Sequence, residues 1–175
     1  EEEERRAGQL PQQHEQVLEE SMWKLAWFTK DEYYRILVTR QGGLFTIIRA
    51  LRIFHDHAIF QAGGIVAIAH LMVQSTSNWE DLRVNMDVVV DALQRHGTNW
   101  HVQCAALEAI CQGSLHDPNL LRTITETYPH ILPLLKEALE SFDEQGKRAI
   151  ETMLKEDAWR SLSSIHNDAT EKEHL

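Results

Sequence analysis

Three stretches of the sequence repeat one pattern of small and aliphatic residues, at intervals of 42 and 43 residues. Each stretch has small residues near its start, an aliphatic residue at the sixth position, and an aliphatic residue or methionine at the ninth. Small residues on one face of a helix let neighbouring helices approach closely, and self-similarity at such a period is typical of stacked helical repeats. The three stretches are 60–71, 102–113 and 145–156.

A second recurring segment precedes each of these stretches and ends its aliphatic run in Ala-Leu. These segments are 44–54, 86–95 and 131–140. A shorter helix is expected before two of them, at 31–40 and 119–127, whereas the corresponding stretch at 75–84 lacks the pattern and looks degenerate. Runs that alternate at period two, which would predict strands, are missing. The sequence therefore predicts an all-α chain with three helices in each unit.

Glycine and proline fall between the predicted helices and mark where they end. Gly42 and Gly43 are expected to terminate one helix, because glycine tolerates the left-handed backbone conformation found there. Asp117 is expected to cap the next short helix, with Pro118 as its first residue. Pro133 fits the first turn of its helix, where the missing amide hydrogen costs little.

Four short motifs resemble the consensus of the armadillo repeat family. They are Met22–Trp27, 31–41, Gly42-Gly43-Leu44 and Ala50-Leu51, and the resemblance extends over about residues 14–157. It implies a right-handed α-solenoid of about three and a half units, since a period near 43 with three helices is the armadillo spacing and two long helices would indicate HEAT repeats. The implied divisions are an acidic extension at 1–10, a repeat domain at 11–160 with units at about 11–29 (partial), 30–73, 74–115 and 116–157, and a polar tail at 161–175.

In that family the last helix of each unit lines a concave groove, where a Trp and an Asn four residues later bind extended peptides. By register, the Trp position holds Glu20, Val66, Glu108 and Glu151, and the Asn position holds Lys24, His70, Gln112 and Lys155. No position matches, so the family's mode of peptide recognition does not carry over. The eight residues should still share one polar face of mixed charge, because residues four apart are neighbours on a helix. That face is either a partner-binding groove or simply solvated.

Charge and hydropathy narrow the class of partner. The net charge of −10 disfavours nucleic-acid binding and leaves a protein or peptide, which could be basic, as the expected partner. The longest apolar stretch, 58–73, is too short and too interrupted to span a membrane. The sequence begins with four glutamates and no signal-peptide pattern, which suggests a segment of a longer protein. Oligomeric state stays open.

The cysteines and histidines offer little catalytic chemistry. Cys104 and Cys111 lie about 10 Å apart along one predicted helix, so reduced thiols and a cytoplasmic or nuclear location are expected. None of the usual zinc or calcium motifs occurs among the ten histidines and the acidic residues, so we expect no metal and no cofactor. Scattered surface imidazoles are the simplest interpretation. His101 and Cys104 could meet on one helix face, but Cys104 lies in the packing register.

The tryptophans are expected mainly to pack. Trp23 and Trp27 should pack against the next repeat. Trp79 and Trp100 lie in polar segments between helices, where they could anchor a loop or act as binding hot spots.

A non-catalytic protein-interaction scaffold is therefore the leading hypothesis. The alternatives are an interior segment of a longer solenoid and, less favoured, an enzyme using the region around His101 and Cys104. Exposed apolar helix faces at the ends of the stack would favour the interior segment, and polar ends would favour a complete domain.

Overall fold

The computed structural model describes residues 2–73 and 75–141, and this part of the chain is helical with no strand. All-α is therefore confirmed for the described residues. The third predicted stretch at 145–156, the residues Glu151 and Lys155, and the polar tail at 161–175 lie outside them. The helices are α1 (Glu2–Phe28), α2 (Glu32–Arg40), α3 (Gly43–Ile53), α4 (Ala58–Met72), α5 (Thr76–Arg83), α6 (Asp87–Arg95), α7 (Trp100–Ser114), α8 (Leu120–Thr127) and α9 (Ile131–Ser141).

Side chains that cap backbone amides start several of these helices. The Asp31 carboxylate accepts a hydrogen bond from the Tyr33 amide at 2.9 Å and starts α2, as an N-cap residue should. Gly42, between α2 and α3, has a φ of +69°. This left-handed conformation confirms that the glycine ends α2, because other residues adopt it only with strain.

Two helix starts differ from the sequence prediction. The stretch at 75–84 is a regular helix, α5, whose first turn is capped by the Ser75 hydroxyl accepting from the Asn78 amide. The start at Pro118 was wrong by two residues, because α8 begins at Leu120. The Asp117 carboxylate accepts from the Asn119 amide at 2.9 Å, so it stabilises a turn ahead of the helix.

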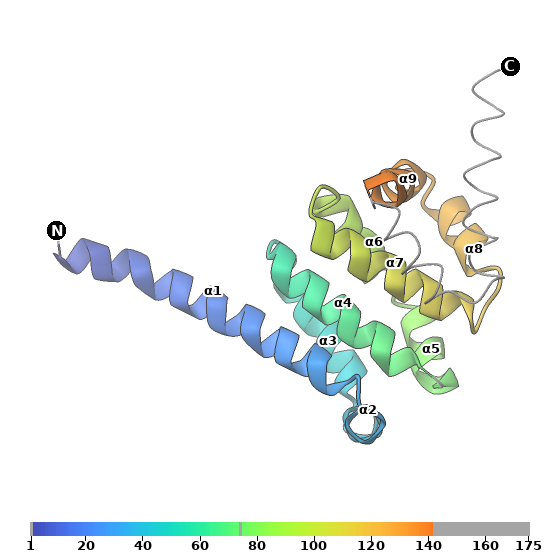
Figure 1. Cartoon of the computed structure of the whole chain (residues 1–175), viewed down its shortest axis with the longest axis horizontal. Coiled ribbons are helices and arrows are strands. Elements are labelled where there is room, and N and C mark those ends of the chain that lie inside the picture. The colour runs from blue at the N-terminus through green and yellow to red at the C-terminus, as the bar shows by residue number, and fades with distance from the viewer. Residues whose placement is uncertain (1, 74, 142–175) are drawn as a thin grey trace, which may run out of the picture.

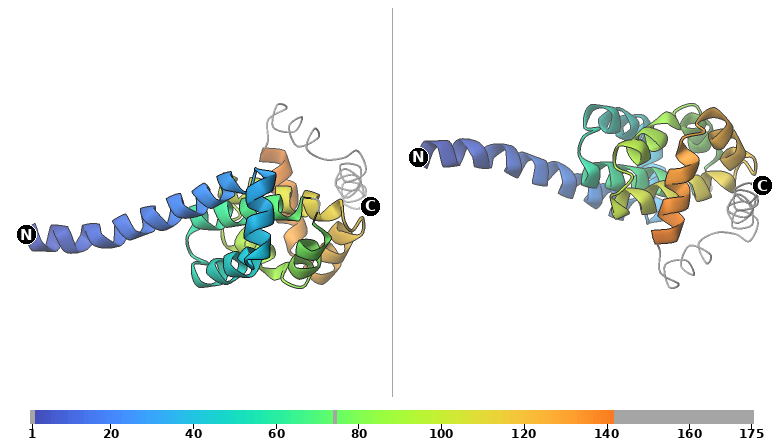
Figure 2. Two further views of the ribbon diagram at one scale, coloured as in Figure 1. Left: turned by 90° about the horizontal axis from the view of Figure 1, so that it is seen from below. Right: turned by 90° about the horizontal axis from the view of Figure 1, so that it is seen from above.

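The helices lie in two layers. In one, α4 lies side by side with α1 and α7 (Figure 1). Behind it lie α3 and α6, which pack against α4 and α7, and α9, drawn end-on in Figure 1, follows and packs against α6 and α7. The predicted adjacency of the stretches 60–71 and 102–113 is thereby confirmed, since they form most of α4 and α7. The N-terminal half of α1 extends away from the other helices, past the expected boundary at residue 10 (Figure 2).

Small residues let the helices of the first layer approach closely. A Cβ atom at Gly63 of α4 would lie 3.2 Å from Met22 Cγ and 3.4 Å from the backbone nitrogen of Trp23 in α1. Ala105 and Ala106 of α7 are fully buried in the same way. The apolar residues of α4 are spread around its whole circumference. This is expected of a helix that has neighbours on almost every side.

Two buried polar contacts recur along the chain. The amide of Gln61 in α4 donates to the carbonyls of Leu51 and Phe54 at the end of α3, at 2.8 and 3.0 Å. The amide of Gln103, 42 residues later in α7, donates to the carbonyl of Gly97 beyond the end of α6. The carbonyls left unpaired at helix ends need such partners when they are buried.

Histidines make the second recurring contact. His70 Nδ1 lies 3.0 Å from the Ala26 carbonyl near the end of α1, and His116 Nε2 lies 2.9 Å from the Met72 carbonyl at the end of α4. His96 Nε2 similarly contacts the His55 carbonyl at 2.8 Å. Because a carbonyl only accepts, the imidazole nitrogen must donate in each case. The interpretation of these histidines as scattered surface residues was wrong.

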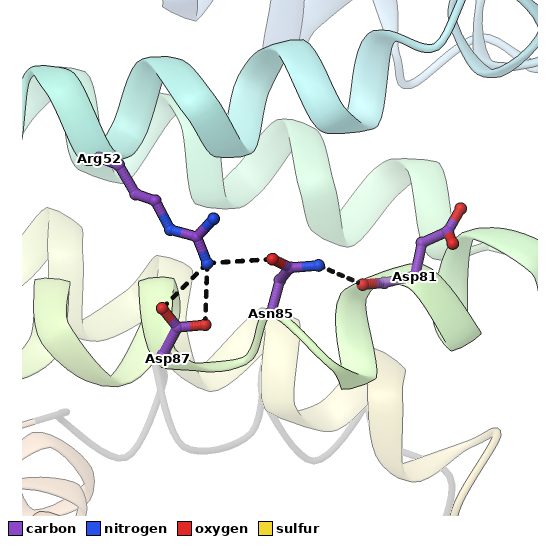
Figure 3. Close-up of polar contacts among 4 residues, drawn as sticks. All are labelled: Arg52, Asp81, Asn85 and Asp87. Atoms are coloured by element: carbon purple, nitrogen blue, oxygen red, sulfur yellow. Dashed lines mark hydrogen bonds and ion pairs between the residues drawn. The ribbon is translucent and has the colours of Figure 1, made fainter.

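An exposed polar bridge joins α3 to the turn between α5 and α6 (Figure 3). The Arg52 guanidinium donates to both carboxylate oxygens of Asp87, at 3.1 and 3.0 Å, and to the side-chain oxygen of Asn85 at 3.0 Å. The Asn85 amide in turn donates to the Asp81 carbonyl. Arg52 therefore links α3 to the start of α6 rather than pointing freely into solvent.

Candidate interaction surface

Six of the eight predicted groove residues belong to the described part of the chain, and all six lie on the first helix layer. They come in pairs one helical turn apart: Glu20 and Lys24 on α1, Val66 and His70 on α4, and Glu108 and Gln112 on α7. We call the side of α1, α4 and α7 that bears these residues the third-helix face. Its composition is less uniform than the expected polar stripe.

The α1 pair behaves as expected. Lys24 Nζ donates to Glu20 Oε2 at 3.3 Å, and both side chains are largely exposed. The hydrogen bond from Lys24 holds the pKa of Glu20 below its ordinary value, with a second bond from Gln16 acting the same way. Such exposed pairs contribute little to stability.

The α4 pair is turned into the protein. Val66 packs against the core, and only 14% of the His70 side chain is exposed. His70 Nδ1 contacts both the Ala26 carbonyl and the Thr29 hydroxyl, the latter at 3.2 Å. Burial is the main cause that lowers the pKa of His70. The expectation that His70 projects freely from the groove was therefore wrong, because it caps the end of the adjacent α1.

Glu108 of α7 lies against this histidine. Its Oε1 is 3.6 Å from His70 Nε2, and the carboxylate is mostly buried. Burial raises the pKa of Glu108, and the charge of Lys30 partly offsets the rise. Because the imidazole is neutral at neutral pH and the separation exceeds a hydrogen bond, this contact is not a salt bridge. Gln112, one turn later, is half-buried.

The His101 and Cys104 region lacks the features of an activated thiol. Burial is the main cause that raises the pKa of the Cys104 thiol to about 11 and that of Cys111 to about 12. A nucleophilic cysteine needs a lowered pKa. The His101 ring lies edge-on to Trp23 and Trp100, with ring centroids 6.4 and 6.5 Å away. Within residues 2–73 and 75–141, no group of three histidines, cysteines or acids could hold a metal ion.

Aromatic side chains give the third-helix face its apolar character. Half-buried Trp23 of α1 meets His101 of α7 across α4, so side chains of the two flanking helices converge over the small residues of α4. Trp27 is 70% exposed, with Lys30 Nζ 5.0 Å from its ring centroid. The expectation that Trp27 packs inward was wrong, because Met22 and Ala26 occupy the side of α1 that is buried.

Of the other two tryptophans that the structure describes, one is buried in the core and one is exposed at the surface. Trp79 is buried in α5 and stacks on the His116 ring, with centroids 6.0 Å apart and planes 8° apart. It is therefore a packing residue in a helix, and the expected polar loop does not exist. Trp100 begins α7 and is half exposed.

One exposed surface was not predicted. Helix α2 has no buried residue, and its exposed aromatic and aliphatic side chains are Tyr33, Tyr34, Ile36 and Leu37. A groove of about 290 Å³ runs beside it, lined in part by Ile36, Arg40, Leu71 and Val73. One signal of this exposed surface was present in the sequence: apolar residues occur on more than one side of this helix. Burying all of them would take more neighbouring helices than a single predicted unit provides.

Comparisons with known proteins add no further assignment. No family model, no curated protein and no solved structure matches the chain. Among the helices that the structure describes, none is long and apolar enough to cross a membrane.

Proposed function

We propose that this chain is a non-catalytic protein-interaction scaffold, an armadillo-like solenoid that binds a protein or peptide partner on its third-helix face. The observation that carries the proposal is the pair Trp23 and Trp27 on α1, one half-buried across α4 and the other 70% exposed. Tryptophan is the residue type most enriched at the energetic centres of interfaces. A cytoplasmic or nuclear setting fits the two free cysteines, of which Cys104 is half-buried and Cys111 buried.

The recurring contacts support the solenoid part of the proposal. Gln61 and Gln103 bind carbonyls at the end of the preceding helix, and His70 and His116 each bind a carbonyl near the end of a first-layer helix, α1 and α4 respectively. In a solenoid each repeat contacts mainly its neighbours, so equivalent contacts should return at each period.

The charges on this face define the partner's chemistry. Glu20, Lys24 and Lys30 surround the two tryptophans with both signs of charge. A partner is expected to place an apolar or cationic side chain on the Trp27 ring and to exchange polar contacts with its neighbours. The net charge of −10 favours a basic polypeptide over an acidic one.

The exposed α2 face supports a second candidate, an interior segment of a longer solenoid. In that case a preceding repeat would cover the apolar side of α2. The two candidates are not exclusive, because an interior segment can also bind a partner on its third-helix face.

Selection from a random peptide library displayed on phage tests the proposed function. Peptides that bind the protein should lose at least tenfold in affinity for Trp27→Ala, and the charge reversal Lys24→Glu should alter association and its salt dependence. Amide shifts in a titration followed by nuclear magnetic resonance should gather on α1, α4 and α7. If the selected peptides bind both variants as tightly as they bind the wild type, the binding surface lies elsewhere.

Arg49→Glu is the matched control for these substitutions. Arg49 is exposed on α3, outside the first helix layer, and makes no ion pair within the described residues. Arg52 is unsuitable as a control although it is exposed on the same helix, because reversing its charge would break the bridge to Asp87 (Figure 3).

A further inference from the structure

Helix α2 carries a continuous apolar surface that nothing in the described chain covers. In Figure 1 it lies at the lower edge of the molecule with no other helix beyond it. Tyr33 is 69% exposed, and the ring centroids of Phe28 and Tyr34 are 5.2 Å apart and those of Tyr33 and Tyr34 5.4 Å apart. We call this surface the α2 patch; its members are Phe28, Tyr33, Tyr34, Ile36 and Leu37.

The helical positions place three of these residues in one outward stripe. Tyr33 and Leu37 are one turn apart, and Ile36 lies beside them at three residues from Tyr33. Val38 turns the other way and packs against the core. The outward stripe is therefore an apolar ridge on a helix whose inner side is already occupied.

The charges at the two ends of α2 are arranged so that these ends complement each other when two copies run antiparallel. Glu32 stands at the first position and Arg40 at the last, and both are exposed with no ion pair among the residues that the structure describes. They are separated by eight residues, or about 12 Å along the helix. Ile36 lies midway. Two copies of α2 laid antiparallel about Ile36 bring each Glu32 opposite the other copy's Arg40.

We propose that the α2 patch pairs with the α2 patch of a second copy of this chain, forming a two-fold symmetric dimer centred on Ile36. In such an isologous contact the same surface serves both partners, which the self-complementary charges satisfy. An acidic or a basic partner would satisfy only one end of the helix.

The groove beside α2 gives this pairing a place for a large side chain. In the antiparallel register Tyr33 opposes the second copy's Thr39, and Thr39 lines the groove together with Leu71 and Val73. The most exposed ring of the α2 patch in one copy therefore enters the groove of the other. A ring seated in an apolar groove is the kind of anchor that dominates interface energies.

The size of the surface sets the expected strength. One nine-residue helix with its neighbours offers less than the roughly 800 Å² per partner of a standard stable interface. The dimer is therefore weak and its population depends on concentration. Sedimentation velocity between about 1 µM and about 1 mM should show a rising weight-average mass that extrapolates to twice the monomer mass.

Removing the ring tests the apolar contact. Tyr33→Ser should weaken the dimer at least tenfold, and because Tyr33 is largely exposed the variant should keep the circular dichroism and melting temperature of the wild type. A dimer of unchanged strength in this variant would overturn the proposal, and so would a wild-type chain that stays monomeric across the whole concentration range.

Charge exchange tests the register. Glu32→Arg alone and Arg40→Glu alone each place like charges opposite one another and should weaken the dimer. An equimolar mixture of these two variants restores both pairs, so it should form a heterodimer, and the double variant should dimerise with itself. If neither the mixture nor the double variant recovers association, the antiparallel register is wrong.

Charge reversals on α8, far from α2, serve as the control for the charge exchange. Glu126 and Arg122 form an exposed pair on α8, and Glu126→Arg and Arg122→Glu make the same charge changes far from α2. Neither should alter dimerisation. Association that responds equally to the α8 and α2 reversals would reflect net charge alone and would overturn the proposed interface.

Discussion

Replacing Gln61 with leucine should destabilise the protein because it removes the partner of two helix-end carbonyls. Gln61 is 2% exposed, and its amide donates to the Leu51 and Phe54 carbonyls at 2.8 and 3.0 Å. Leucine keeps most of the volume, so the change isolates the hydrogen bonds from the packing. Without this amide the buried Leu51 carbonyl loses its side-chain partner, whereas the Phe54 carbonyl still accepts from the His57 amide at 3.2 Å.

The expected magnitude follows mainly from the Leu51 carbonyl. A buried group left without a partner costs about 1–3 kcal/mol, and the Phe54 carbonyl adds little because it keeps the His57 amide. Gln61→Leu should therefore lower the free energy of unfolding by about 1–3 kcal/mol. For a chain of this length that corresponds to a drop of about 2–12 °C in melting temperature.

Urea denaturation followed by far-ultraviolet circular dichroism measures the effect. Gln94→Leu serves as the control, because Gln94 is exposed on α6. Gln103→Leu should cost a similar amount, since Gln103 caps Gly97 in the equivalent position. A loss below about 0.5 kcal/mol, within the range of ordinary surface substitutions, would refute the view that Gln61 secures the end of α3.

Three further substitutions test the buried titratable groups and the core. Burial raises the pKa of Glu108, so its ionised form is penalised in the folded state; Glu108→Gln should raise the urea midpoint at pH 7, and the gain should vanish as the pH falls below the ordinary value of 4.5. The pKa of His70 is lowered, so the unfolded chain binds its proton first and stability should fall as the pH drops through about 6.5; a His70→Gln variant with the same pH profile of melting temperature would contradict this. Leu107 is 1% exposed in α7, so Leu107→Asp buries an unpaired charge and should abolish the cooperative thermal transition, and a wild-type melting curve would show that the side chain has escaped to solvent.

Local signals in the sequence were enough to place most helices. The 42-residue recurrence placed α4 and α7 in one register, and the structure brings them side by side. Asp31 and Gly42 marked the start and end of α2 because capping and left-handed backbone geometry depend on neighbouring residues only. Pro133 stands in the first turn of α9, where proline is tolerated.

The sequence failed where long-range contacts decide the outcome. The polar stretch of α5 looked degenerate because its apolar period is broken by Asn78. That residue is buried, and its amide donates to the Thr39 hydroxyl at 2.8 Å and to the Leu71 carbonyl at 2.6 Å. Partners 39 and 7 residues away satisfy it, and no local pattern reveals them.

The groove residues show the same division. Their spacing correctly placed six of them on three neighbouring helices, because periodicity determines which helix face a residue occupies. Whether a residue on that face is solvated depends on the neighbouring helices. His70 contacts Ala26 near the end of α1 and Thr29 just beyond it, whereas Lys24 is largely exposed and pairs with Glu20 of its own helix.

The sequence alone determined that the described part of this chain is helical and which stretches form most of its helices, because hydrogen bonding within a helix and capping at its ends are local. Only the tertiary structure decided which apolar faces are covered. Helix α2 and helix α4 are both rich in apolar residues, yet α4 has neighbours on nearly all sides, whereas nothing in the described part of the chain covers the outer side of α2. The burial of a helix depends on how many other elements pack against it, and the residue pattern of a single helix does not predict that number.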